Sequence, residues 1–211
     1  MKHINKGREI AEFTDFIQHE HPTSWEDLHQ NQRAAGLYQK CRDHILMTEQ
    51  NFLGGYTERC LINSENLHID HFKKKGMNWP LDVTFDWNNF VVEDRSTEYG
   101  ACYKDNHTHS MEDYARLLNP ITDYPETMMT YQPDGKIVAK KSIGAEECDK
   151  VEFTIGRFNL NHEKLRKMRE KVIKLIVETY SSLSDEEVRD AMTEEGFPTV
   201  VDWALAMRKV I

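Results

Sequence analysis

The sequence predicts an α+β fold in which a small strand–strand–helix core lies between helical N-terminal and C-terminal flanks. Leu67 and Ile69 alternate with polar residues, as in a half-buried strand, and a second apolar run begins at Asn89. Apolar residues at helical spacing occur on both sides of this segment. We therefore expect an N-terminal helical arm over residues 1–53, the core over 54–118, and a hairpin with a C-terminal helical region over 119–211.

The first half of the chain contains both helix and strand signals. Thr23 and Glu26 fit a capping box, which predicts a helix start at Thr23. The spacing of apolar residues predicts a helix over residues 32–52, and Gly54-Gly55 ends it. Strands are predicted over residues 56–62, 66–70 and 87–93.

The second half is predicted to be mostly helical. Ser110 caps a short helix, and residues 128–140 form a hairpin around Pro133-Asp134-Gly135. We expect a further strand within residues 147–158. Helices are then predicted over residues 161–183, from Ser184 to Gly196, and over residues 200–211.

The composition limits the functions that the chain can have alone. Of its 211 residues, 36 are acidic and 27 are basic, so the net charge is −9. An acidic chain is repelled by nucleic-acid phosphates, so a nuclease of this charge needs local basic patches or a partner. No apolar stretch approaches the roughly 18 residues of a membrane span, and we expect a cytoplasmic protein with no membrane contact.

The four cysteines do not form a C-x-x-C pair. Reduced thiols are the ordinary state of cysteines in the cytosol. Cys60 and Cys102 flank the histidine-rich part of the chain, and a metal ion shared between them stays open as an alternative.

The segment His68-Ile69-Asp70-His71 is the centre of the predicted site. If Leu67 and Ile69 face the core, His68 and Asp70 share the opposite face of the strand, and His71 lies where the strand ends. Asn89 opens the next strand, and a polar cluster over residues 104–109 leads into a helix. This order is the plan of a ββα-metal nuclease site.

Phosphodiester hydrolysis needs an activated water and a cation against the developing charge. His71 suits the general base because imidazole titrates near neutral pH. Asp70 suits a divalent cation such as Mg²⁺, and Asn89 would fix the loop. The remaining candidates are His68 and Lys104 for catalysis, and Asp105, Asn106 or His107 for completing the metal shell.

Basic and apolar residues outside this segment have two interpretations each. The run Lys73-Lys74-Lys75 can grip phosphates or form an exposed loop, and the basic residues over 164–174 can bind nucleic acid or form a solvated helix face. A stripe on the same predicted helix either docks on a partner or lies in the chain's own core; its residues are Leu165, Met168, Val172, Leu175 and Ile176.

Several motifs occur together in a specific order: Gly55-Tyr56-Thr57-Glu58-Arg59, His68 to Phe72, Thr84 to Asn89, Tyr103 to Asn106, and Leu118-Asn119-Pro120. With them the sequence resembles the HNH endonuclease family that includes PtuB of Septu defence systems and its relatives encoded in retrons. The similarity extends to about Arg169.

The resemblance implies a single-metal HNH endonuclease that acts in antiviral defence against phage. It implies a PtuA-like ATPase as partner, a nucleic acid substrate, and in retrons a reverse transcriptase with its RNA and DNA. Asp70 would be the metal carboxylate, His71 the general base and Asn89 the central asparagine. Thr57 stands where the family has a cysteine, and the third HNH position stays open.

Two alternatives follow from these departures. Beside the interpretation as an active endonuclease, the first alternative is a catalytically degenerate HNH-like adaptor that bridges an ATPase and nucleic acid, and the second is a structural metal-binding domain without a nucleic-acid role.

Overall fold

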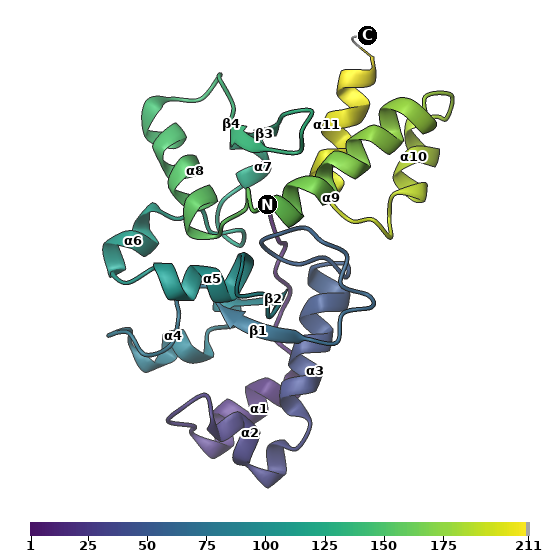
Figure 1. Cartoon of the computed structure of the whole chain (residues 1–211). Helices are drawn as coiled ribbons and strands as arrows, with labels where there is room; N and C mark the ends of the chain where they lie inside the picture. The colour runs from purple at the N-terminus through teal and green to yellow at the C-terminus, as the bar shows by residue number, and fades with distance from the viewer. Residues whose placement is uncertain (210–211) are drawn as a thin grey trace.

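The computed structural model describes residues 1–209 and combines helices with two small antiparallel sheets (Figure 1). In the first sheet β1 (Leu67–His71) pairs with β2 (Phe90–Asp94), and in the second β3 (Met129–Tyr131) pairs with β4 (Ile137–Ala139). The α+β class is therefore confirmed. No helix within the described range is both long and apolar enough to cross a membrane.

Short helices surround the sheets. Before β1 lie α1 (Ala11–Glu20), α2 (Asp27–Gln30), the 3₁₀ turn η1 (Gln32–Ala34), α3 (Leu37–His44) and the π turn η2 (Ile45–Glu49). Between β1 and β2 lie α4 (Leu81–Phe85) and the 3₁₀ turn η3 (Trp87–Asn89). After β2 lie α5 (Gly100–His107), α6 (Met111–Arg116), α7 (Pro125–Met128), α8 (Ala145–Arg157), α9 (Glu163–Lys174), the π turn η4 (Leu175–Thr179), α10 (Asp185–Ala191) and α11 (Pro198–Arg208).

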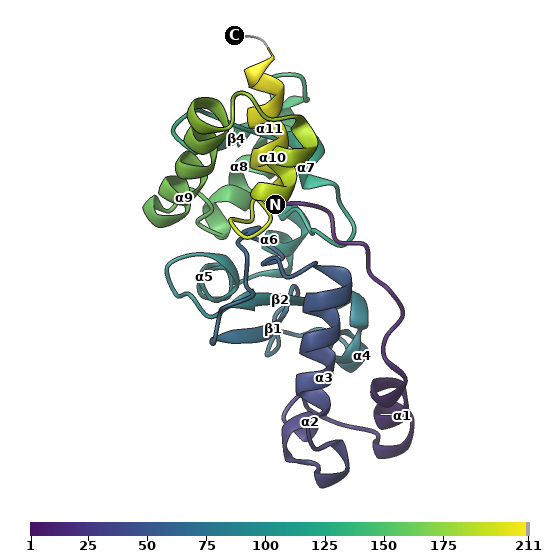
Figure 2. The same ribbon diagram turned by 90° about the vertical axis from the view of Figure 1, so that its right-hand side faces the viewer.

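The first sheet separates two apolar cores. Ile69 pairs with Val92, and both belong to the N-terminal core, a cluster that also contains Phe13 and Trp25. Val91 lies on the other face and belongs to the C-terminal core, which α8, α9 and α11 help to build. Figure 2 shows β1 and β2 between α5 and α3. Because side chains alternate along a strand, each face of this two-stranded sheet is buried against a different core.

The N-terminal segment connects the two cores. Met1 and Ile4 are buried in the C-terminal core, and the Ile4 amide donates to the carbonyl oxygen of Pro120 at 2.7 Å. Phe13 and Phe16, on α1, are buried in the N-terminal core. The first residues of the chain therefore run from one core to the other, as Figure 2 shows.

Two predicted strands are wrong. Residues 56–62 form turns with isolated bridges at Cys60 and Arg59, and Glu58 has a left-handed φ of 60°, which a regular strand excludes. Residues 147–158 lie mostly in helix α8, where the Glu147 carboxylate accepts the Gly144 amide at 2.9 Å. Val151 and Thr154 are buried on one side of that helix, so its apolar spacing is helical.

Two of the predicted helix caps are present in the structure. Ser110 and Ser184 accept amide hydrogen bonds at the starts of α6 and α10, as predicted. The predicted box at Thr23 is wrong, because the Asp27 carboxylate instead accepts the amides of Thr23 and Ser24. The hairpin at residues 128–140 is confirmed by β3 and β4.

The helix predicted over residues 161–183 is α9 followed by η4, with His162 rather than Asn161 as its cap. Leu165, Val172 and Ile176 are fully buried, and Val172 and Ile176 belong to the C-terminal core, so this part of the stripe lies inside the chain itself, whereas Met168 is 37% exposed. The last predicted helix corresponds to α11, and residues 210–211 lie outside the described part of the chain.

Most basic residues of α9 are paired with carboxylates. Lys171 contacts Glu195 at 2.7 Å, and Lys174 contacts Glu170 at 2.7 Å. Arg169 is different because its side chain is inside the core, 1% exposed. Its guanidinium donates to the carbonyl oxygens of Gly135 at 2.6 Å and Leu160 at 2.7 Å, and so fixes the β3–β4 turn on α9.

Replacing Arg169 with Met should lower the free energy of unfolding by about 3 kcal/mol, because two buried carbonyl groups lose their donors. Urea unfolding measures the loss. The matched control is Lys167→Met on the exposed face of the same helix, where loss of the solvent-screened ion pair with Glu163 should leave the urea midpoint nearly unchanged. Equal effects of the two variants would contradict the anchoring role of Arg169.

Candidate functional site

A buried ion pair joins the end of β1 to α5. The Lys104 ammonium lies 2.7 Å from Oδ2 of Asp70, and the two side chains are 0% and 3% exposed. The same ammonium donates to the carbonyl oxygens of His71 at 2.7 Å and Phe72 at 3.0 Å. These three bonds use all the hydrogens that a lysine ammonium has. Lys104 therefore holds α5 to both the side chain and the backbone of the strand end.

Tyr56 is a second donor to Asp70. Its hydroxyl donates to Oδ2 at 2.5 Å, and burial together with the Asp70 charge raises the Tyr56 pKa well above its ordinary value. Gly55 makes this approach possible, because a Cβ there would lie 2.2 Å from Val91. Sequence reasoning missed the role of Tyr56, although Gly54-Gly55 beside it is a signal of close backbone approach.

Asp105 is the other carboxylate at the Lys104 ammonium. Its Oδ1 lies 3.0 Å from the nitrogen, but it has no hydrogen-bond donor among the described residues. Burial and the nearby Asp70 charge raise the Asp105 pKa to about 6. Asp70, Lys104 and Asp105 are thus a cation between two carboxylates.

His71 leaves β1 on the opposite face from Asp70, as strand alternation requires. It is 4% exposed and makes edge contacts with Trp25, 4.5 Å between ring centroids, and with Phe90 at 5.0 Å. Nε2 lies 3.0 Å from the carbonyl oxygen of Thr84. A carbonyl only accepts, so Nε2 carries the hydrogen and Nδ1 of the neutral ring keeps a free lone pair. Burial lowers the His71 pKa to about 3.

Asn89 fixes the loop between the strands. Its Oδ1 accepts the Lys73 amide at 2.8 Å, and its Nδ2 donates to the carbonyl oxygens of Lys73 at 3.2 Å and Val83 at 2.9 Å. The clamp holds both ends of the loop that contains Thr84. Asn89 therefore positions the group that determines the tautomer of His71.

Among the other predicted site residues, His68 lies on the same face of β1 as Asp70. His68 has Nδ1 3.0 Å from the carbonyl oxygen of Glu93, and burial lowers its pKa to about 4. Asn106 and His107 are exposed, and the His107 ring stacks on Tyr103 at 3.8 Å. Of the three candidates for completing the metal shell, only Asp105 contacts the Lys104 ammonium, whereas Asn106 and His107 are exposed to solvent.

The lysine run has structural partners. Lys74 donates to the carbonyl oxygens of Asp105 and Thr108, each at 2.6 Å, and so caps the C-terminal end of α5. The ammonium of Lys73 lies over Trp79, and that of Lys75 over Trp25. Lys73 and Lys75 are thus exposed loop residues with aromatic neighbours, whereas Lys74 holds the loop to α5.

A divalent metal ion does not fit this arrangement. Asp70 Oδ2 already accepts from Tyr56 and Lys104, and the ammonium lies where a cation would contact Asp70 and Asp105. Within residues 1–209, no group of three or more His, Cys, Asp or Glu side chains is placed to hold a metal ion.

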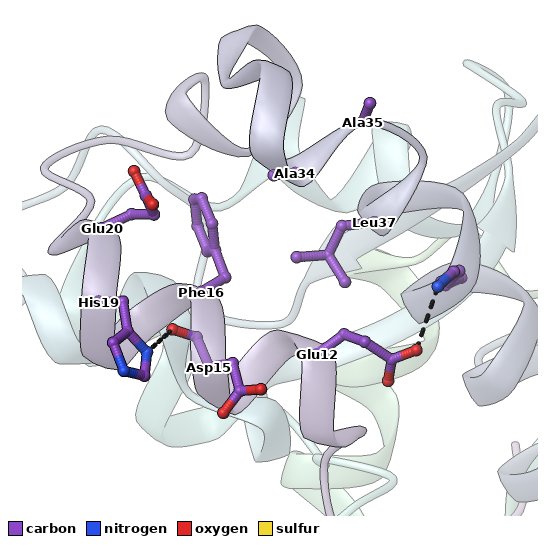
Figure 3. A pocket seen from close by; sticks show the side chains of 9 residues that line it. Glu12, Asp15, Phe16, His19, Glu20, Ala34, Ala35 and Leu37 are labelled. Carbon is purple, nitrogen blue, oxygen red and sulfur yellow. Dashed lines mark hydrogen bonds and ion pairs between the residues drawn. The ribbon is translucent and has the colours of Figure 1, made fainter.

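A separate pocket of about 320 Å³ lies between α1 and α3. Figure 3 shows Phe16 and Leu37 in it, with the Glu12 carboxylate held by Lys40 at 3.1 Å. None of the predicted site residues lines this pocket. It is therefore distinct from the site at the strand end.

Comparison with protein-family models finds no matching family, and no curated protein matches the sequence. The family resemblance of the motifs therefore stays a prediction.

The low pKa of His71 predicts a pH dependence of stability. Between pH 6.5 and about 3 the unfolded state binds a proton that the folded state does not, so stability falls as the pH falls through this window. His71→Gln keeps a donor for Thr84 but does not titrate. Between about pH 7 and about pH 4.5 it should lose about 2 kcal/mol less than wild type in urea unfolding.

The exposed residue His109 provides the control, since His109→Gln should leave the pH dependence unchanged. Identical acid profiles for wild type and His71→Gln would contradict a buried neutral His71.

Proposed function

We propose that this chain is an HNH-type endonuclease that hydrolyses phosphodiester bonds of nucleic acid as the effector of an antiphage complex with an ATPase. The observation that supports the proposal most directly is the state of His71. It is a neutral imidazole at a strand end with its lone pair on Nδ1, and a carbonyl of the loop that Asn89 clamps holds its tautomer.

The chemistry of the chain's own residues follows from this tautomer. Nδ1 of His71 takes a proton from water while the water oxygen attacks phosphorus, and the ester P–O bond breaks as the departing sugar oxygen takes up a proton from a second water, which leaves a phosphate monoester and an alcohol. The hydrogen bond from Nε2 to Thr84 stabilises the imidazolium that forms. A divalent cation would supply charge at the phosphate, and it does not fit the present arrangement of Asp70 and Lys104.

The site is closed in this structure. Asp70 and His71 are 3% and 4% exposed, and Trp25 from the N-terminal arm covers the His71 ring. A phosphodiester reaches Nδ1 only after this cover moves. The net charge of −9 also opposes binding of nucleic acid by the chain alone. Both features support a partner that delivers the substrate and opens the site.

A catalytically degenerate adaptor is the second candidate. It is favoured by Lys104, whose ammonium neutralises the carboxylate that the family resemblance assigns to the metal. Such an adaptor would bridge the ATPase and nucleic acid without cutting.

The test is His71→Gln in the complex with the ATPase, assayed for nucleic-acid cleavage and for protection against phage. Cleavage should fall by roughly 100-fold to 10,000-fold, because a general base is removed while the Thr84 hydrogen bond is kept. The exposed-histidine variant His109→Gln should cut at the wild-type rate. Full protection by His71→Gln would establish the adaptor and reject the nuclease.

A further inference from the structure

We infer that Lys104 is the resident cation of the candidate site, and that in this conformation it excludes divalent metal ions from Asp70. The inference deepens the proposed function and rests on it, because a cation position matters here only if the site acts on phosphodiesters. Its test measures metal binding rather than cleavage, so the two proposals can fail separately.

The position of the ammonium is the first argument. Lys104 Nζ lies 2.7 Å from Asp70 Oδ2 and 3.0 Å from Asp105 Oδ1, between the two carboxylates. A Mg²⁺ ion shared by these carboxylates would lie about 2.1 Å from each oxygen, in the volume that the ammonium fills. The lysine and the metal ion cannot be bound at the same time.

The two carboxylates differ in their hydrogen-bond donors. The ammonium hydrogens go to Asp70 and to the carbonyl oxygens of His71 and Phe72. Asp105 Oδ1 is left beside the cation with no donor among the described residues. The three hydrogens of the ammonium already bind other acceptors, so Lys104 does not donate to Asp105 Oδ1. A spherical divalent ion in the same place would contact this oxygen directly, as it contacts any carboxylate ligand.

Burial makes the exclusion strong. The Lys104 side chain is 0% exposed, so water does not screen its pairing with Asp70. The Lys104 ammonium lies over the rings of Tyr56 and Phe72, with Nζ 5.7 Å and 5.9 Å from their centroids. A metal ion therefore gains access only if α5 withdraws this side chain from the strand end. Lys74, which binds the carbonyl oxygens of Asp105 and Thr108 at the C-terminal end of α5, opposes that movement.

The experiment measures Mn²⁺ binding to the purified full chain by the electron paramagnetic resonance signal of free Mn²⁺, with calorimetry as a second readout. Wild type and Asp70→Asn should bind Mn²⁺ equally weakly, because Asp70 is not available. Lys104→Ala should bind on the order of 100-fold more tightly, since an unpaired buried carboxylate gains a cation. The double variant with Asp70→Asn should lose that gain.

A matched control is the buried pair of Lys6 and Glu49 in the N-terminal half, whose side chains are 4% and 1% exposed. Lys6→Ala also leaves a buried carboxylate, that of Glu49, without its lysine. Any Mn²⁺ affinity that this variant gains should be the same with and without Asp70→Asn. Lys104→Gln removes the charge and keeps a donor, and it serves if Lys104→Ala does not fold. Circular dichroism verifies folding.

Mn²⁺ binding by wild type that disappears in Asp70→Asn would overturn the inference, whatever the other variants do. Failure of both folded Lys104 variants to gain Asp70-dependent binding would also overturn it. If the His71→Gln complex keeps full protection while Lys104→Ala gains the metal site, the cation assignment stands and the nuclease proposal fails.

Discussion

The contact between Lys104 and Asp70 is the interaction on which the centre of the molecule depends. Removing two charges from water is costly, and the protein offsets the cost by giving the ammonium three acceptors and giving Asp70 a second donor in Tyr56. Loss of either partner alone would leave an uncompensated buried charge, a cost of about 3–5 kcal/mol. One ion pair thereby joins β1, α5 and the loop after Gly55, and these are the parts that define the candidate site.

The two-stranded sheet explains why the candidate residues experience different environments. Asp70 and His71 are neighbours in sequence, but strand alternation directs Asp70 to the polar pocket beside α5 and His71 to the aromatic side chains of the N-terminal core. On the first side the Lys104 ammonium forms an ion pair with Asp70. The second excludes charge and holds His71 neutral, with a pKa lowered to about 3. The sheet thus separates a neutral imidazole on one face from a buried ammonium on the other.

The sequence predicted the features that depend on local chemistry. Ser110, Ser184 and the turn at Asp134-Gly135 act within a few residues of themselves, and the structure has them as expected. The strand expected over residues 56–62 failed because the buried Glu93 carboxylate, distant in sequence, accepts the amides of Tyr56 and Thr57 and holds a turn there. The alternation around Ile69 located β1 and the faces of its side chains. Nothing in the sequence pairs Lys104 with Asp70, because 34 residues separate them and the contact depends on how α5 packs on the sheet.

The N-terminal arm links the closed state of the site to the rest of the fold. Trp25 packs against His71, and the Lys75 ammonium lies over the Trp25 ring, so the residues that flank α2 cover the His71 imidazole. The arm is held by its own small core around Phe13, and the chain before it is fixed in the C-terminal core at Met1 and Ile4. Movement of the arm would therefore uncover the His71 ring without breaking the Lys104 bonds, whereas movement of α5 would break the bonds from Lys104 to Asp70 and to the His71 carbonyl oxygen. The two faces of the sheet are covered by different elements, the arm on the side of the His71 ring and α5 on the side of Asp70, so under the proposed function both covers would have to move before a substrate and a metal ion could enter.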